Sequence, residues 1–415
     1  MRYGTRPGRK TPDPAWKNGQ NLMVLDDTLL RAPYIIDVWT AGRRKKRMAS
    51  ERCAPNVNPL TDSLGRSLFR LKRLVQPVAK RALFWPGIGP VLLSMIKRSP
   101  MRNISVMWSV TYKCPCRCAH CGVNDVKDRS KVELSTDECY ALLDDFAAHP
   151  FAISEIFLFG GEPLVRRDII DIIKRSTSLK LRVVVDTNGW LVDEAMADRL
   201  AEAGLEEARV SLDSPRKEDH DRNRGLAGCY DQAIRAARLL HDRGVRADLS
   251  TFCTVDRMER GDIAAIKEIA RENGLDGVRV LPIFKSGALA DEDPLTPEDE
   301  QMVYSLLEPG FTYYELHVVD NPKSKFICST MLKMLFAVSP YGDVQPCAFC
   351  PASFGNIREE PFNDILERMW ANPIYDHDCH TCLMNQPATP EWLDSLSADG
   401  DVRKNPVLLR HSCRR

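Results

Sequence analysis

Three cysteines within one short segment are spaced so that their thiolates could bind a single metal centre. Cys114, Cys118 and Cys121 form a C-x3-C-x2-C pattern directly after the apolar run 104–110. A four-iron cluster normally takes four cysteine ligands, so three thiolates leave one iron open to a small molecule. An open coordination position is typical of a metal centre that carries out chemistry rather than one that only supports a fold.

A zinc knuckle is the alternative interpretation of this segment. Zinc in structural sites takes four tetrahedral ligands. Cys116 or His120 would have to supply the fourth ligand from within the same tight loop, and that arrangement is sterically poor. The spacing therefore favours iron.

A second motif follows the strand-like run 156–159 and consists of Gly160, Gly161, Glu162 and Pro163. Two glycines near a proline are often only a turn. In this order and at this separation from the cysteines, however, the motif resembles that of the radical S-adenosylmethionine (radical SAM) enzymes. In that family it lies at the second strand and holds the methionine amino group of SAM.

The resemblance implies a radical SAM oxidoreductase or maturase. A 4Fe-4S cluster on the three cysteines would be reduced by an external electron donor of the flavodoxin or ferredoxin type, and SAM would bind at its open iron. Reductive cleavage of SAM would give a 5′-deoxyadenosyl radical that takes a hydrogen atom from the substrate. The surrounding barrel would have to exclude water and hold the target hydrogen close.

Two later segments resemble further SAM-binding turns of the family. Asn188 lies in an Asp-Thr-Asn-Gly run, and Ser211 opens a Ser-Leu-Asp-Ser-Pro run in which Ser214 replaces the usual glycine. Arg224 occupies the position of an arginine that pairs with the SAM carboxylate, a bidentate contact that suits a guanidinium. Arg222 is an alternative for this role, and a solvated basic loop is the non-functional interpretation.

Strand and helix signals alternate from residue 104 onward. The strand-like runs are 104–110, 155–159, 181–186, 207–212, 246–254 and 277–283. Helical patterns fall between them: one opens with a capping box at Ser135, one follows Pro163, and the others cover 192–202, 227–243 and 261–273. This alternation predicts an α/β fold with a parallel sheet and right-handed crossovers. The resemblance implies a partial (β/α)6 TIM-like barrel with its site at the carboxyl ends of the strands.

A second set of cysteines follows the predicted barrel. Its predicted metal ligands are Cys328, Cys347, Cys379 and Cys382. The spacing resembles the SPASM domain of radical SAM enzymes and its shorter form, the twitch domain, which hold auxiliary iron–sulfur clusters. Only Cys413 remains after Cys382, so the resemblance implies one fully ligated auxiliary 4Fe-4S cluster. Cys350 is an alternative ligand or a buried thiol, and zinc is the alternative metal.

The first hundred residues are strongly basic. Residues 1–100 hold 20 Lys and Arg against 6 Asp and Glu, a net charge of +14, so the rest of this 415-residue chain carries −13. The stretch 64–96 is amphipathic, basic and contains tryptophan, which is typical of a helix at a membrane surface. A helix packed on the barrel and a solvated arm are the alternatives. No signal segment follows Met1 and no apolar run reaches the roughly 20 residues that span a bilayer, so we predict a cytoplasmic protein, with peripheral membrane contact through this arm as an option.

These patterns predict four segments. They are a basic, partly disordered N-terminal extension (1–100), the radical SAM partial barrel (101–290), a SPASM/twitch-like domain (291–390) and a C-terminal tail (391–415). The expected function is peptide or protein modification or natural-product biosynthesis on a peptide or small-molecule substrate, with no nucleic-acid partner. Ala348 stands where sulfatase-maturing enzymes carry aspartate, which argues against their reaction. A membrane-associated lipid or isoprenoid substrate and a non-catalytic iron–sulfur or zinc protein are the alternatives.

Overall fold

A computed structural model of the chain describes residues 104–123, 127, 130–149, 153–289, 293–314, 328–377 and 382–409. All of these residues belong to one unit, Ser67–Arg415. The predicted N-terminal extension, its helix at 64–96 and the predicted ligand Cys379 lie outside the described residues.

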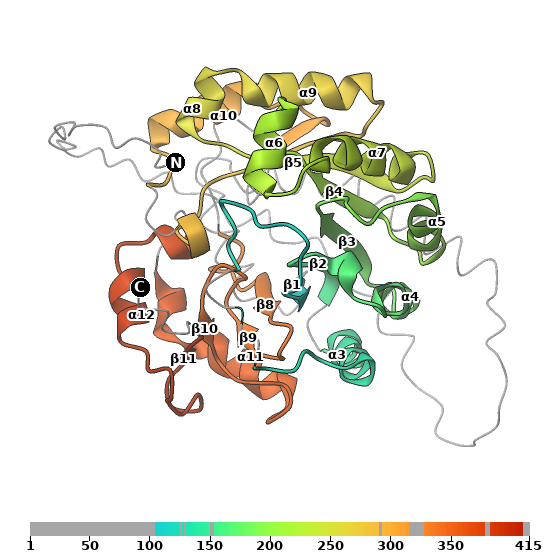
Figure 1. Ribbon diagram of the computed structural model, residues 1–415. Helices are drawn as coiled ribbons and strands as arrows, with labels where there is room; N and C mark the ends of the chain where they lie inside the picture. Colours follow the sequence, from blue (N-terminus) through green and yellow to red (C-terminus); the bar gives the residue numbers. More distant parts are fainter. Residues whose placement is uncertain are drawn as a thin grey trace, which may run out of the picture. The chain divides into compact units, whose positions relative to one another are not determined.

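A mainly parallel sheet forms the centre of the fold (Figure 1). Within the described residues it has nine strands in the order β7-β6-β5-β4-β3-β2-β1-β8-β9. The predicted strands are confirmed as β1 (Ile104–Thr111), β2 (Ile153–Gly160), β3 (Arg182–Thr187), β4 (Glu207–Ser211), β5 (Arg246–Phe252) and β6 (Gly277–Leu281). Each pairs in parallel with the next along the chain, so their carboxyl ends meet at one edge, where the predicted motifs lie.

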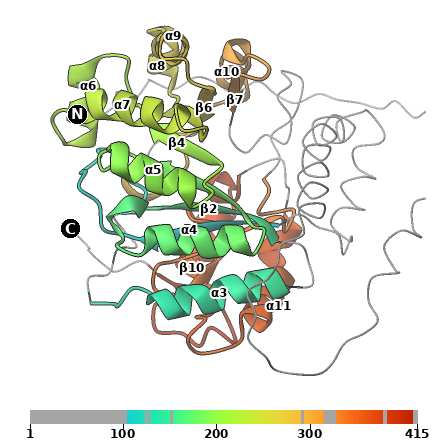
Figure 2. The same cartoon turned by 90° about the vertical axis from the view of Figure 1, so that its right-hand side faces the viewer.

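Helices cover the outer face of these strands, as the α/β alternation predicts. The predicted helices are confirmed as α3 (Thr136–Ala148), α4 (Ile169–Ser178), α5 (Glu194–Glu202), α7 (Cys229–His241) and α9 (Asp262–Glu272). The capping box of α3 is confirmed, because Ser135 Oγ accepts from Glu138 N at 3.3 Å and Glu138 Oε2 accepts from Ser135 N at 2.8 Å. In Figure 2, α3, α4, α5 and α7 lie one beside the next over the sheet. The sequence pattern does not predict α6 (Lys217–Arg224), α8 (Val255–Glu259) and α10 (Pro297–Leu306).

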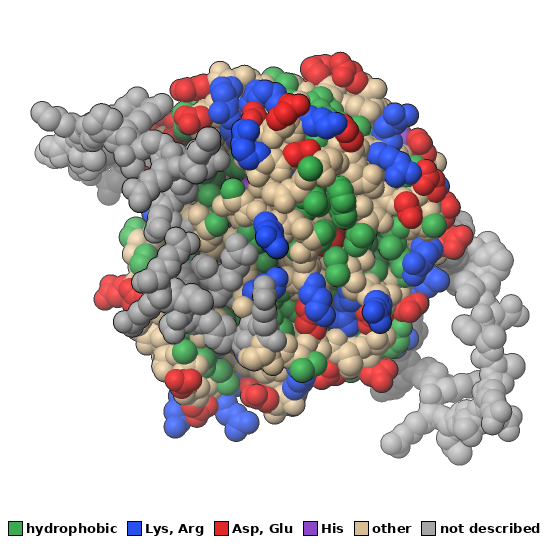
Figure 3. All heavy atoms as spheres, viewed as in Figure 1, with side chains coloured by type: hydrophobic (Ala, Val, Ile, Leu, Met, Phe, Trp, Pro, Cys, Tyr) green, Lys and Arg blue, Asp and Glu red, His purple; other side chains and the backbone are tan. Residues whose placement is uncertain are grey.

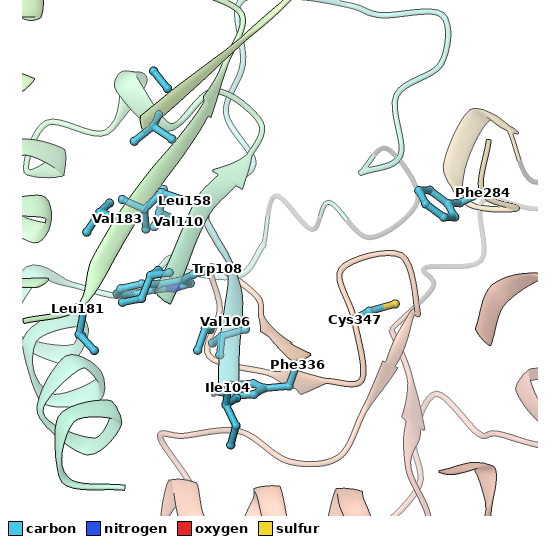
Figure 4. Packing of buried hydrophobic residues seen from close by; sticks show 14 of the residues in the cluster. Ile104, Val106, Trp108, Val110, Leu158, Leu181, Val183, Phe284, Phe336 and Cys347 are labelled. Atoms are coloured by element: carbon cyan, nitrogen blue, oxygen red, sulfur yellow. The ribbon is translucent and has the colours of Figure 1, made fainter. Parts of the chain in front are cut away.

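The core lies between the sheet and these helices. Alternate residues of β1 are fully buried there, namely Ile104, Val106, Trp108 and Val110. Figure 4 shows them in a row beside Leu158 of β2 and Val183 of β3. The Trp108 ring meets Phe146 of α3 edge to face, with the ring centroids 6.2 Å apart. Packing on both sides of β1 makes it a rigid base for the cysteine segment that follows it.

The C-terminal part of the chain extends the same sheet. Its strands are β7 (Thr312–Tyr314), β8 (Leu335–Val338), β9 (Val344–Gln345), β10 (Ala352–Ser353) and β11 (Val407–Leu408). Its helices are α11 (Phe362–Ala371), α12 (Thr389–Asp394) and the short 3-10 helices η4 (Pro373–Asp376) and η5 (Leu383–Asn385). Strand β8 pairs in parallel with β1, and β11 pairs with β10. The segment boundaries at 290 and 390 stay predictions.

Oppositely charged side chains are interspersed on the surface. Figure 3 shows Lys and Arg mixed with Asp and Glu over one face. Ion pairs such as Arg175–Asp144 and Arg235–Glu194 join neighbouring helices, and exposed pairs of this kind contribute at most about 1 kcal/mol each. Among the helices that the structure describes, none has the length and apolar character needed to cross a membrane.

Candidate functional site

The two glycines of the Gly-Gly-Glu-Pro motif bring the end of β2 against the start of the cysteine segment. Gly161 N donates to Thr111 O at 2.7 Å, and Glu162 N donates to Lys113 O at 2.9 Å. A Cβ on Gly161 would lie 2.3 Å from Lys113 O, and one on Gly160 would lie 2.4 Å from Thr111 O. Only glycine therefore permits this close approach, which fixes the base of the cysteine segment.

Glu162 links the carboxyl ends of β2 and β3. Its carboxylate is fully buried and accepts hydrogen bonds from Thr187 Oγ1 at 2.7 Å, Asn188 N at 2.7 Å and Leu164 N at 3.2 Å. Burial raises the pKa of Glu162 to about 7, although these three donors favour its charged form. Pro163 follows as the first residue of the 3-10 helix η2 (Pro163–Val165). The motif thus orients the turn that carries Asn188.

Asn188 reaches the cysteine segment with its side chain. Its Nδ2 lies 3.7 Å from Cys114 Sγ and 3.4 Å from Cys116 Sγ. Its Oδ1 accepts from Trp190 N at 2.9 Å, which holds the amide with its N–H groups toward the thiols. The structure therefore brings together the two sequence motifs and the third-strand turn.

Arg224 meets the same segment from the far side. One guanidinium nitrogen lies 2.7 Å from Asp213 Oδ1 and another lies 3.7 Å from Cys118 Sγ. Burial alone would raise the pKa of Asp213, but the Arg224 guanidinium holds it below its usual value. Arg222 instead is exposed and pairs with Asp219. The geometry separates the two candidate arginines, because Arg224 and not Arg222 faces the cysteines.

Backbone contacts tie the cysteine segment to the helix that carries Arg224. Arg117 N donates to Arg224 O at 2.8 Å, and Ala119 N donates to Asn223 O at 2.9 Å. Gly225 ends α6 in the left-handed region, at φ 61°, where a Cβ would lie 3.0 Å from Arg117 O. Helix α6 therefore positions the cysteine segment as well as the arginine.

His120 and Asp213 are site residues that the sequence interpretation missed. The His120 ring lies over Phe252, with the centroids 4.6 Å apart, and its Nε2 lies 3.8 Å from Asp213 Oδ2. Burial lowers the pKa of His120 to about 4, so the ring is neutral at neutral pH. Ser211 is half-buried and ends β4, two residues before Asp213. A lone aspartate after a strand carries no signal of its role until its partners are known.

Cys116 forms hydrogen bonds with the predicted ligands Cys114 and Cys118 in this structure. Hydrogen bonds from Cys116 lower the pKa of both, that of Cys118 to about 7, which favours the thiolates that bind metals. Cys116 also contacts Cys229. Within the described ranges, no three His, Cys, Asp or Glu side chains are arranged to hold a metal ion, so the ligand assignment stays a prediction.

The site nevertheless fits the groups that the sequence implies. Arg224 Nε is buried and has no hydrogen-bond partner in the described part of the chain, so a donor is left for a carboxylate such as that of SAM. Gly160 and Gly161 let the backbone of their motif pack directly against the start of the cysteine segment. In that segment, Cys114 and Cys118 have lowered pKa values, which favours thiolates.

The second cysteine set is buried beside the sheet. Cys328, Cys347, Cys350 and Cys382 are each no more than 8 % exposed. Burial, and then the charge of Cys328, raises the pKa of Cys347 to about 12, and burial with the charges of the other two raises that of Cys382. These thiols interact with one another and stay protonated without a metal, and a bound cation would stabilise the thiolates that ligate it. Cys350 stays an alternative ligand.

One loop after β6 contacts both cysteine sets. Ala288 N donates to Cys121 O at 3.1 Å, in the first set. Lys285 N donates to Asn385 Oδ1 at 3.4 Å, three residues after Cys382. The Phe284 ring stacks on Phe349 with the centroids 4.4 Å apart. The loop 284–288 thus joins the barrel site to the second cysteine set.

Comparisons with known proteins agree with this geometry. The model of the radical SAM superfamily matches residues 108–269, and that of the SPASM iron–sulfur cluster-binding domain matches residues 328–383. The chain is 30% identical over 345 residues to the Fe-coproporphyrin III synthase of Methanosarcina barkeri, covering 73% of this chain and 84% of that protein. It is 28% identical over 277 residues to the PqqA peptide cyclase of Granulibacter bethesdensis, covering 63% and 73%.

A solved structure shows the same fold. Streptococcus suis SuiB bound to its precursor peptide SuiA superposes with a TM-score of 0.52 at 14% identity, covering 79% of this chain and 74% of SuiB. The expected cofactors, a 4Fe-4S cluster with SAM and an auxiliary iron–sulfur centre, follow from the two family matches. The chain therefore belongs to the radical SAM superfamily, as an enzyme with a C-terminal SPASM domain.

Proposed function

We propose that this radical SAM enzyme abstracts a hydrogen atom from a peptide substrate held between its two cysteine sets. The observation that carries the proposal is the loop 284–288, which contacts Cys121 through Ala288 and the segment after Cys382 through Lys285. A substrate bound beside this loop lies next to both centres. The PqqA peptide cyclase among the relatives supports a peptide as the substrate class.

The residues of the barrel site have separate roles in this proposal. Cys114, Cys118 and Cys121 hold the SAM-binding cluster, and the SAM-binding residues are Gly160, Gly161, Glu162, Pro163, Asn188, Ser211 and Arg224. When bound, the cluster supplies the electron that splits SAM to the 5′-deoxyadenosyl radical. The auxiliary centre is held by Cys328, Cys347, Cys379 and Cys382. An external flavodoxin or ferredoxin is the proposed electron donor.

One guanidinium N–H of Arg224 has no partner within the described residues and suits a carboxylate acceptor. His120 is neutral at neutral pH because burial lowers its pKa to about 4. Asp213 takes one face of the guanidinium and leaves Nε unpartnered within the described chain. The carboxylate of SAM can accept a hydrogen bond from this nitrogen, and such a charge-assisted bond is stronger than a neutral one.

Arg224→Lys tests this role while keeping a positive charge beside Asp213. We expect SAM to bind about 10- to 100-fold more weakly, because an ammonium cannot donate to Asp213 and to the SAM carboxylate from separate, fixed nitrogens, and a hydrogen bond to a charged group contributes about 1.5–3 kcal/mol. Isothermal titration of the reconstituted protein with SAM measures the change. Arg222→Lys is the matched control, because Arg222 is exposed and pairs with Asp219. If Arg222→Lys weakens SAM binding and Arg224→Lys does not, Arg222 and not Arg224 binds the SAM carboxylate.

A tetrapyrrole is the second candidate substrate. It is favoured by the 30% identity to Fe-coproporphyrin III synthase over 345 residues, a longer match than that to the peptide cyclase. The stacked rings of Phe284 and Phe349 lie at the proposed position of the substrate.

Product analysis separates the two substrates. The anaerobically reconstituted enzyme is given dithionite, SAM and either a mixture of synthetic peptides or Fe-coproporphyrin III. We expect peptides to raise 5′-deoxyadenosine release above the substrate-free rate and to show a mass change. Stimulation by the porphyrin alone would favour the second candidate, and stimulation by neither would contradict both.

The basic arm adds a further proposal, contact with a membrane surface through residues 64–96. These residues lie outside the described ranges, so only their composition supports it. Flotation of the full chain with anionic liposomes at low salt tests the contact. An arm that does not bind such vesicles would remove the lipid and isoprenoid alternatives.

A further inference from the structure

Tyr375 is a buried phenol in the SPASM domain that no motif predicts. Its side chain is 2% exposed and lies in η4, which follows α11 directly. Asn372 caps η4, because its Oδ1 accepts from Ile374 N at 3.0 Å and its carbonyl oxygen accepts from Tyr375 N at 3.1 Å. Helix α11 is itself anchored in the core by Ile365 and Leu366, which are fully buried. The phenol therefore has a fixed position.

The Tyr375 ring lies close to the second cysteine set. Burial, and then the charges of Cys350, Cys347 and Cys328, raises the pKa of Tyr375 well above its usual value. Thr330, the other buried hydroxyl nearby, already shares hydrogen bonds with Cys328 and Cys347. Thr330 thus hydrogen-bonds to these thiols, and Tyr375 interacts electrostatically with the same group.

The Tyr375 hydroxyl lacks a hydrogen-bond partner among the residues that the structure describes. Burying a hydroxyl without a partner is costly, so buried phenols are usually paired. A tyrosine that is held by a capped helix turn, is 2% exposed and has an unpartnered hydroxyl suggests an acceptor that occupies this place in the working protein. Sulfur atoms of an iron–sulfur cluster are such acceptors.

We propose that the Tyr375 hydroxyl donates a hydrogen bond to a sulfur of the auxiliary cluster and thereby raises its reduction potential. A donor stabilises the reduced cluster more than the oxidised one, because reduction adds negative charge to the sulfurs. Lys333 Nζ lies 5.7 Å from the centre of the Tyr375 ring, and a cation at the ring face makes the O–H a stronger donor. The inference rests on the proposed assignment of the auxiliary ligands.

Tyr375→Phe tests the inference because it removes the hydroxyl and keeps the ring. The full-length protein is reconstituted, its iron is counted, and the auxiliary cluster is titrated by EPR. A second background, in which Cys114, Cys118 and Cys121 are replaced by alanine, isolates the auxiliary signal. We expect unchanged iron content, a more negative midpoint potential and loss of one exchangeable proton coupling in D2O. Tyr304→Phe is the control, because Tyr304 is a buried phenol on α10 whose pKa is raised by burial and Glu300 and not by these cysteines.

The outcomes separate this inference from the proposed ligand set. An unchanged potential and unchanged proton coupling in a variant that keeps both clusters would overturn the inference alone. A wild-type protein with about four irons instead of about eight would overturn the auxiliary assignment and the inference with it. If Tyr375→Phe loses the cluster, the contact is tested instead in wild-type protein that carries ring-deuterated tyrosine. A deuteron coupling to the auxiliary cluster supports the contact, and the absence of this coupling overturns the inference.

Discussion

Cys114→Ala is expected to remove SAM cleavage while iron remains in the SPASM domain. Loss of a residue that only supports a metal ligand lowers affinity or activity about 10- to 100-fold, so loss of a direct ligand should exceed that range. The Cys114 thiol lies 3.7 Å from Asn188 Nδ2, and no described contact joins it to the second cysteine set. The measurements are iron per chain and 5′-deoxyadenosine release after anaerobic reconstitution. About four irons and no release are expected.

Cys116→Ala is the matched control for Cys114→Ala. Cys116 lies in the same segment and shares hydrogen bonds with Cys114 and Cys118, so the structure itself presents it as a rival ligand. The C-x3-C-x2-C spacing leaves it out, and we expect its alanine variant to keep the iron and most of the SAM cleavage. If Cys116→Ala is inactive and Cys114→Ala is active, the ligand set begins at Cys116 and the assignment from spacing is wrong.

Strand β1 could be predicted because it is an apolar run with buried residues at alternate positions. Ile104, Val106 and Trp108 show the alternation in β1, and every one of them is fully buried. Helix α6 could not be predicted in this way. Its sequence is almost entirely charged, and His220 is its one buried residue. Helix α6 is held in position by its contacts with the cysteine segment and not by an apolar face. Contacts of this kind produce no periodic hydrophobic pattern in the sequence.

Long-range pairing limited the prediction of the C-terminal part. Strand β8 has four residues and pairs with β1, which lies more than 220 residues earlier in the chain. A short buried run gives no indication of its partner, so the extension of the sheet beyond the partial barrel could not be anticipated. The same limit applies to Tyr375, because a tyrosine in a short turn after an amphipathic helix has the pattern of an ordinary core residue.

The site was predicted through motifs, and the structure adds what supports them. Resemblance proposed Glu162 and Arg224, and their burial and partners agree with functional roles. It did not identify Asp213, which pairs with Arg224, or His120, which stays neutral beside it. Such partners come from separate strand ends and meet only when the sheet forms. Their identity therefore depends on tertiary structure, which a local motif does not encode.

Gly161→Ala is expected to lower SAM cleavage by about 100-fold or more. The new Cβ would lie 2.3 Å from Lys113 O and 2.8 Å from the carbonyl carbons of Lys113 and Tyr112. These are backbone atoms, so the methyl group can be accommodated only by moving the base of the cysteine segment. Displacing catalytic groups by about 1 Å can lower a rate about 100-fold. The rate of 5′-deoxyadenosine release measures the effect, and iron per chain shows whether the cluster still assembles.

Gly122→Ala separates this steric effect from a general intolerance of the segment. Gly122 directly follows Cys121, and the nearest atom to a Cβ placed there would be Ser286 Oγ at 3.9 Å, an ordinary contact distance. Neither glycine has a positive φ, so the two substitutions differ mainly in the space around the added methyl group. We expect Gly122→Ala to keep the iron content and nearly all of the SAM cleavage. Equal activity in both variants would show that the cysteine segment tolerates displacement, and the close packing of the two motifs would then not be needed for SAM cleavage.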